Sequence, residues 1–141
     1  MQTIRHMRGV TLIELMTVIV VVAILGTIAV SSYRSYLLRT NRTEARMALL
    51  RVQAAQEKFF LQNNRYAGDA ELALAPPAGL GVEATTPSGY YTIGLIDVTA
   101  TTYTARAQAA AGQLDDTDAC QTLTIDESGV REPDDHPECW R

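Results

Sequence analysis

The chain has 141 residues, enough for one domain and an anchor, with 47% hydrophobic residues and a formal net charge of −4. Its two histidines, His6 and His136, lie far apart, and its two cysteines do not form a CxxC pair. This composition argues against a zinc centre and offers no catalytic constellation, so we expect no enzyme activity, no metal and no cofactor.

The net charge hides a division along the chain. From Arg34 to Arg65 seven basic residues stand against two acidic ones, whereas from Tyr66 to the end three arginines stand against thirteen acidic residues. Opposite signs in the two halves favour association between copies, with the head of one molecule beside the stem of another. Two solvated surfaces of opposite sign explain the same pattern equally well.

The N-terminal region combines a short basic segment with a long apolar one. Residues 1–9, MQTIRHMRG, resemble the charged leader of an export signal. Apolar residues then dominate from Val10 to Val30, and the 19 residues from Leu15 to Tyr33 carry no charge. This is about the length at which a helix crosses a membrane, so we expect a membrane-inserted helix.

One carboxylate, Glu14, interrupts the apolar stretch. An ionised carboxylate is costly in a membrane interior, so a retained one is expected to have a positive partner. Cleavage of the chain after Gly9 would place the new α-amino group of Val10 one helical turn from Glu14, in the same chain or in a neighbouring one.

The helical pattern continues well beyond the apolar stretch. No proline or glycine occurs from Ser35 to Asn63, and apolar positions recur at steps of three and four residues: Leu38, Ala45, Leu49, Val52, Gln56 and Phe59 or Phe60. We predict a helix from Val10 to about Asn63 whose second half buries one stripe. The sequence NRTE at 41–44 is typical of a helix cap and predicts a kink or a restart there.

The rest of the chain predicts a loop followed by a small sheet. Glycines and prolines punctuate residues 66–89, which we expect to form a long connecting loop. Segments rich in Tyr, Thr, Ile and Val predict strands at 90–98, 101–109 and 120–130. Three or four antiparallel strands are not stable alone, so the predicted fold class is α+β, with one sheet face packed on the second half of the helix.

Both cysteines, Cys120 and Cys139, lie near the C-terminus. An exported head meets an oxidising compartment, where a disulfide is the expected state, and it would stabilise the fold by about 3 kcal/mol. The acidic run DDTD at 115–118 has two interpretations, a plain acidic turn or a site for a hard cation such as calcium.

The stretch RG followed by VTLIELM, at residues 8–16, resembles the class III signal of the type IV pilin superfamily. The resemblance implies that a prepilin peptidase cuts between Gly9 and Val10 and methylates Val10, and that Glu14 neutralises a neighbour's N-terminus during assembly. It also implies the type IV pilin fold, with a leader at 1–9, a transmembrane and filament-core helix at 10–33 and a soluble head at 34–141. The Cys120–Cys139 loop resembles the C-terminal disulfide region of type IVa members.

Residues 39–67 and the ending CWR are most similar to PilE-type minor pilins of type IVa pili. This implies a minor pilin that takes part in pilus assembly and, through the pilus, in adhesion and twitching motility. Its expected partners are other pilin subunits, the prepilin peptidase and the inner-membrane assembly platform. We expect an inner-membrane protein with a periplasmic head before assembly, and a component of the extracellular pilus afterwards.

One departure from the family concerns the apolar helix. Many type IVa pilins carry a proline where this chain has Ser31 and a glycine where it has Ala23. The family uses that pair where the helix loosens in the filament, and the sequence leaves open whether Gly26 and Thr27 take over this role.

Two other functions remain open. A DNA-uptake pilin needs exposed cations near a groove or tip, and the head offers only Arg106, Arg131 and Arg141 against thirteen acids, so nucleic acid is not an expected partner. A type II secretion pseudopilin more often resembles a calcium-bound pattern, whereas this chain has the cysteine pair. The sequence does not decide between a major and a minor subunit, nor the position in the fibre.

Overall fold

The computed structural model describes residues 10–141, so the predicted leader at 1–9, including Gly9, lies outside the described residues. The chain divides into two compact units between Tyr36 and Leu37. A single helix, α1 (Leu12–Asn63), contributes its first part to one unit and its second part to the other. The predicted long N-terminal helix is therefore confirmed.

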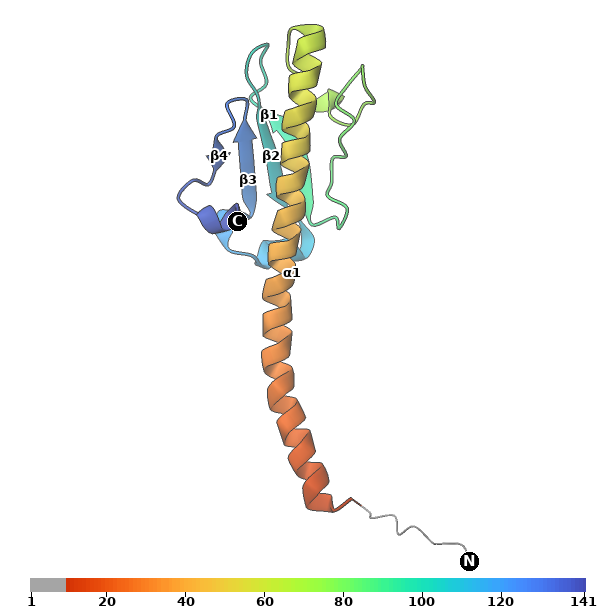
Figure 1. Ribbon diagram of the computed structural model, residues 1–141, viewed down its shortest axis with the longest axis vertical. Coiled ribbons are helices and arrows are strands. Elements are labelled where there is room, and N and C mark those ends of the chain that lie inside the picture. The colour runs from red at the N-terminus through yellow and green to blue at the C-terminus, as the bar shows by residue number, and fades with distance from the viewer. Residues whose placement is uncertain (1–9) are drawn as a thin grey trace, which may run out of the picture. The chain divides into compact units, whose positions relative to one another are not determined.

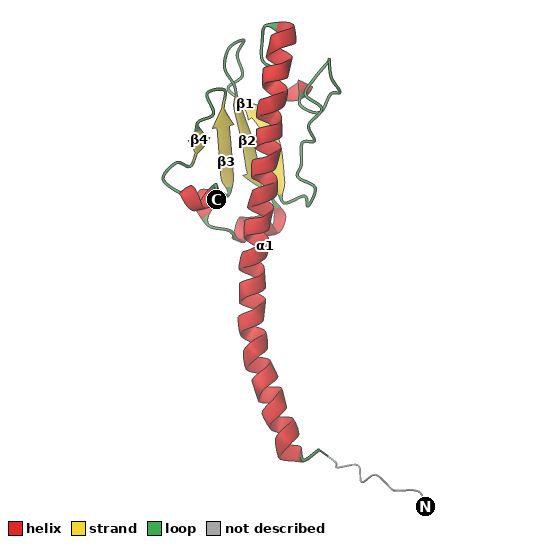
Figure 2. Ribbon diagram, in the orientation of Figure 1, coloured by secondary structure: helices red, strands yellow, loops and turns green. Residues whose placement is uncertain are grey.

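The second unit, Leu37–Arg141, contains one antiparallel sheet with strands in chain order (Figures 1 and 2). The strands are β1 (Tyr91–Ile96), β2 (Thr104–Ala109), β3 (Thr122–Asp126) and β4 (Arg131–Glu132). Each of the three predicted segments contains one strand. The fourth strand has only two residues, too few for any alternation to be visible in the sequence.

One face of the sheet forms the core with α1. The cross-strand rows Ile93–Ala107–Leu123 and Leu95–Ala105–Ile125 are buried, while the alternate positions of β2 point away from the core. The central strand β2 presents only alanines to the core, at 105, 107 and 109. Helix α1 lies across the sheet (Figure 1), and small side chains on β2 let a helix pack close to it.

The buried face of α1 follows the predicted three- and four-residue steps. Its buried residues are Asn41, Ala45, Ala48, Leu49, Val52, Gln56 and Phe59. The predicted restart at 41–44 is wrong, because α1 runs through these positions without interruption. Asn41 lies in the buried face and uses its side chain for a tertiary hydrogen bond instead of a helix cap.

Residues 66–89 form the predicted loop, with one short 3-10 helix at Asp69–Glu71. Gln56 holds the start of this loop: its Oε1 accepts a hydrogen bond from Ala67 N at 2.8 Å, and its Nε2 donates to Ala67 O at 2.9 Å. Next to it, Arg65 pairs with Glu71 at 2.6 Å. Hydrogen bonds from Arg65 and from Gly68 N lower the pKa of Glu71 to about 2.

The first unit contains the apolar part of α1. By length and composition, α1 qualifies as a helix that could cross a membrane, and none of its most apolar window is buried by the described chain. A core helix of a soluble domain would be largely covered by its own fold. An apolar helix surface that its own chain leaves uncovered is instead expected to be buried by something outside the chain.

We predict that Gln56→Leu destabilises the second unit by at least about 2 kcal/mol, because leucine fills the space but leaves the buried N–H and C=O of Ala67 without partners. Urea unfolding of the full chain in detergent, followed by the fluorescence of the single tryptophan, Trp140, measures this loss. Gln62→Leu, at an exposed position of the same helix, serves as the control. Equal midpoints for the two variants would show that the Gln56 bonds are not needed.

Candidate functional site

The N-terminal end of α1 is held by Thr11 and Glu14. The backbone N–H of Glu14 donates to Thr11 Oγ1 at 3.3 Å, and the spacing T-x-x-E is that of a capping box. Glu14 lies in the first turn, where a negative charge also complements the helix dipole. Capping and the helix dipole are enough to explain a carboxylate in the first turn of a helix that lies in water.

The surroundings of Glu14 differ from those of an ordinary cap. The neighbouring apolar side chains Val10, Leu12 and Ile13 are 69 to 78% exposed. Among residues 10–141, the Glu14 carboxylate has no hydrogen bond or ion pair, so it is available to a partner from outside. Val10, the expected new N-terminus, precedes the helix. The roles assigned to Gly9, Val10 and Glu14 stay predictions.

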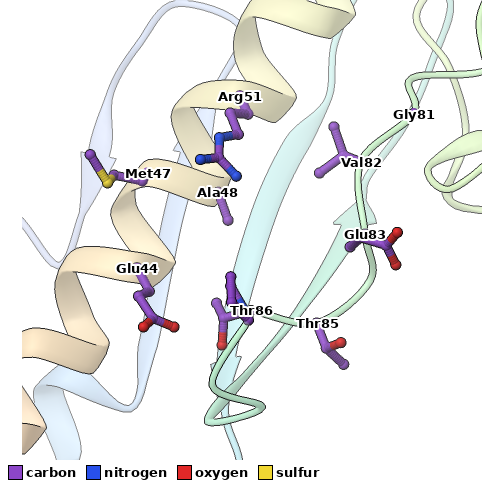
Figure 3. A pocket seen from close by; sticks show the side chains of 10 residues that line it. Glu44, Met47, Ala48, Arg51, Gly81, Val82, Glu83, Thr85 and Thr86 are labelled. Carbon is purple, nitrogen blue, oxygen red and sulfur yellow. The ribbon is translucent and has the colours of Figure 1, made fainter.

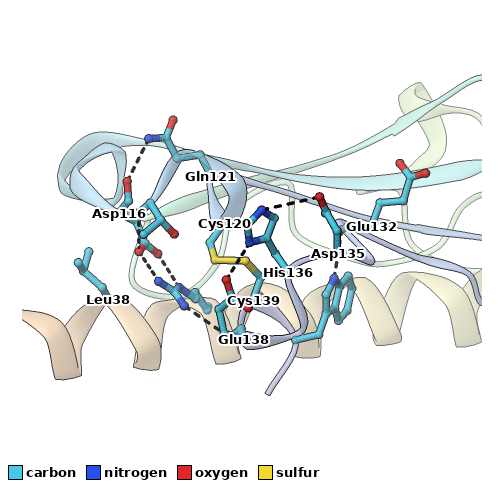
Figure 4. The surroundings of a disulfide bond; sticks show 12 residues. Leu38, Asp116, Cys120, Gln121, Glu132, Asp135, His136, Glu138 and Cys139 are labelled. Carbon is cyan, nitrogen blue, oxygen red and sulfur yellow. Dashed lines mark hydrogen bonds and ion pairs between the residues drawn. A yellow bond between two sulfur atoms is a disulfide. The ribbon is translucent and has the colours of Figure 1, made fainter.

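The predicted disulfide between Cys120 and Cys139 is present, with a Cα–Cα distance of 5.2 Å. Each cysteine ends a short 3-10 helix, Asp118–Cys120 or Pro137–Cys139, and both are fully buried. The hydroxyl of Tyr91 on β1 donates to Cys120 O at 2.9 Å. The bond therefore joins the C-terminal loop to the sheet (Figure 4).

Beside the disulfide, four polar residues join α1 to the segment that follows β2. Asn41 Nδ2 donates to Gln113 Oε1 at 2.9 Å, and Gln113 Nε2 donates to Asp116 Oδ2 at 2.7 Å and to Leu38 O at 3.2 Å. Arg42 makes a two-pronged ion pair with Asp116 through Nε and Nη2. We call Asn41, Arg42, Gln113 and Asp116 the buried polar network.

The charges of this network depend on each other. Burial by itself raises the pKa of Asp116, but hydrogen bonds from Arg42 and Thr117 N outweigh it and hold the pKa below its ordinary value. The hydrogen bond to Asp116 raises the pKa of Arg42. Because the pKa of Asp116 is lower in the folded protein than its ordinary value, the interactions of the ionised carboxylate stabilise the fold. This contribution is complete above the ordinary pKa and is lost as the pH falls through the lower pKa of the folded protein.

The cation-site interpretation of DDTD is not supported. Asp116 is already paired with Arg42, and no group of three or more His, Cys, Asp or Glu side chains suited to a metal occurs in the described part of the chain. His136 lies at the surface, with ring nitrogens 2.9 Å from Glu138 and 3.8 Å from Asp135. Its hydrogen bond to Glu138 raises the pKa of His136.

A hollow of about 490 Å³ lies between α1 and the loop at 81–87 (Figure 3). Glu44 on its helix wall accepts hydrogen bonds from Ser88 N and Oγ at 3.2 and 2.6 Å. Thr86 on the loop wall is bonded to the backbone of Tyr91.

Sequence reasoning missed the buried polar network. Arg42 and Asp116 are 74 residues apart, and Asn41 and Gln113 are 72 apart, so no local pattern relates them. The available signal was weak: Asn41 falls on the apolar stripe of the helix, where a polar residue needs a buried partner.

Two protein-family models together match residues 4–124. A model described as "Type IV minor pilin ComP, DNA uptake sequence receptor" matches residues 31–124. A second model, "Prokaryotic N-terminal methylation motif", matches residues 4–30. The second range includes all three predicted N-terminal site residues.

One curated protein is similar to this chain over about half of the chain's length. The type IV major pilin protein PilA of Myxococcus xanthus (strain DK1622) is 38% identical over 73 residues, which are 51% of this chain and 33% of that protein. The chain thus matches about a third of the length of this relative.

Similarity to solved structures lies at the level of the fold. A type IV pilin from Shewanella oneidensis is 23% identical, with a TM-score of 0.50, over 69% of this chain and 92% of that one. The non-core minor pilin PilV of Neisseria meningitidis is 16% identical, also with a TM-score of 0.50, over 69% and 86%. The α+β fold predicted above is confirmed by the structure and shared with both.

We predict that Asp116→Asn lowers the free energy of unfolding of the second unit by about 3 kcal/mol, because it leaves the largely buried Arg42 guanidinium without its counter-charge. Urea unfolding of the full chain in detergent, followed by Trp140 fluorescence, measures the change. Asp134→Asn, which alters an exposed carboxylate in the C-terminal loop, should stay within about 0.5 kcal/mol of the wild type. A loss for Asp116→Asn no larger than that of this control would contradict the prediction.

Proposed function

The chain belongs to the type IV pilin family, and from this premise we propose that it is a minor subunit of a type IV pilus. The observation that carries the proposal is the division of α1. Its first part is apolar and uncovered by the chain, while its second part forms the core of a disulfide-bonded unit. Such a molecule suits a filament in which the apolar parts gather inside and the second units face outward.

The proposed maturation uses the first residues of the motif. A prepilin peptidase removes residues 1–9 by cutting between Gly9 and Val10, and the new α-amino group of Val10 is methylated. Because Glu14 has no partner for its carboxylate within residues 10–141, it is free to pair with the N-terminus of a neighbouring subunit. The pairing removes two unpaired charges from an apolar bundle, which favours assembly.

Before assembly the apolar part of α1 is proposed to lie in the inner membrane, with the second unit in the periplasm. The disulfide fits this location, since such bonds persist in oxidising compartments. The proposed partners are other pilin subunits, the peptidase and the inner-membrane assembly platform. Adhesion and twitching motility would then be activities of the whole pilus, to which this subunit contributes.

DNA binding is a second candidate, favoured by the description of the family model that matches residues 31–124. The charges of the second unit oppose it. Arg106 on β2 and Arg131 on β4 are exposed, but Arg131 lies over the ring of Trp140 at 5.3 Å, and thirteen acids follow Tyr66. A polyanion is attracted by clusters of free cations, so this surface suits DNA poorly.

Gly9→Val should leave a full-length precursor in the membrane, because the residue before the cut must enter the peptidase without a side chain. Intact-mass measurement of the purified protein shows whether residues 1–9 and the N-terminal methyl group are present. Gly26→Ala is the matched control, since a β-carbon at Gly26 meets nothing within 4 Å, and it should be processed normally. A mature mass for Gly9→Val would overturn the proposed maturation.

Glu14→Ala should give a cleaved, membrane-inserted and folded protein that enters pili poorly. Removing the carboxylate eases insertion into lipid, but it leaves a neighbour's ammonium unpaired in the apolar bundle. The measurement is the amount of this protein in sheared pili relative to the membrane. Glu83→Ala, at an exposed position in the connecting loop, should leave this ratio unchanged. An unchanged ratio for Glu14→Ala as well would show that Glu14 has no part in assembly.

The two candidate functions are separated by a binding assay. In fluorescence anisotropy with a labelled duplex at 150 mM salt, we expect no binding by the full chain in detergent at up to about 10 μM. Binding that weakens steeply with salt and is reduced by Arg106→Gln would favour the DNA-receptor function instead.

A further inference from the structure

At one end of the second unit, apolar side chains are exposed close to the point where α1 enters. Leu114 is 55% exposed and follows Gln113, whose amide is bonded to Leu38 O and Asn41. The ring of Tyr90 lies against Gly112, and Tyr90 O accepts a hydrogen bond from Ala110 N at 2.9 Å. We call Leu37, Tyr90 and Leu114 the basal patch.

The basal patch lies at the end of the unit that is nearest, along the chain, to the candidate membrane span. The uncharged run ends at Tyr33, and the second unit begins at Leu37, four residues later. Tyr33 and Tyr36 are 64% and 61% exposed. Tyrosines are enriched at membrane–water interfaces, where the ring lies among the acyl chains and the hydroxyl meets water.

We propose that, before assembly, the basal patch rests on the lipid headgroup layer, so that the second unit contacts the membrane surface directly. The proposal rests on the proposed membrane insertion of residues 10–33. Arg39, two residues after Leu37 in the chain, is exposed, and its charge attracts anionic headgroups. Asp115 and Asp118, which follow Leu114 in the chain and are exposed, keep the contact shallow because carboxylates do not enter the hydrocarbon.

The opposite end of the same unit supplies a matched control. Val130 is 56% exposed, almost the same as Leu114, and lies in the turn between β3 and β4. A β-carbon at the adjacent Gly129 would lie 3.4 Å from Nε2 of Gln53. Gln53 is twelve residues beyond Asn41, or about 18 Å along α1 at 1.5 Å per residue. The two side chains therefore lie at well-separated levels of the second unit.

The test uses nitroxide labels on single cysteines introduced into the full chain, as Leu114→Cys, Val130→Cys and Val22→Cys. Labelling without reductant keeps the Cys120–Cys139 bond, which intact-mass measurement verifies. The labelled proteins are inserted into vesicles of phosphatidylethanolamine and phosphatidylglycerol. Power-saturation spectroscopy then compares collisions with oxygen, which concentrates in lipid, and with a water-soluble nickel chelate.

We expect the ratio of oxygen to nickel collisions to be highest at position 22, intermediate at 114 and lowest at 130, with 114 severalfold above 130. Equal, water-like ratios at 114 and 130, with an immersed label at 22, would overturn the membrane contact alone. A water-like label at 22 would overturn the proposed insertion as well. A label at 114 shielded from both reagents would reveal a protein contact at the basal patch and would also contradict the inference.

Discussion

The apolar surface of α1 between Leu12 and Val30 must be buried by something outside the chain, and the proposed function depends on this constraint. Its large side chains are about half to three-quarters exposed, and no other described element covers them. Removing apolar surface from water is favourable by about 25 cal/mol per square ångström. A stripe of this length is therefore too costly to leave in water. Lipid can cover it in a single subunit, and equivalent helices can cover it in a filament.

The second half of the same helix solves its burial problem within the chain. Its buried residues belong to the same hydrophobic core as the alanines of β2, and the buried polar network joins it to the segment after β2. Arg42 Nη1 also donates to Glu138 O beside Cys139, so the C-terminal loop is tied to the helix by this bond and to the sheet by the Cys120–Cys139 bond. A subunit that changes surroundings during assembly can thus keep its second unit intact.

The sequence was sufficient for everything that depends on local periodicity. Helix α1, the positions of three strands and the long loop follow from spacing and residue type. The disulfide follows from the two cysteines and the oxidising compartment expected for an exported head. Interactions between distant residues could not be predicted. The cap-like sequence at 41–44 does not interrupt the helix, because Asn41 and Arg42 bind Gln113 and Asp116. Gln56, which the spacing places on the apolar stripe, forms hydrogen bonds with the backbone of Ala67.

The most direct test of this account asks what covers the apolar surface in each state. A photo-crosslinking amino acid placed at Val22, which is 61% exposed and half-way along the apolar run, can be activated in membranes and in sheared pili. The account predicts lipid adducts in the membrane and adducts with other pilin subunits in the pili. Water-quenched products without adducts in either state would contradict it, because they would show that the surface is not buried.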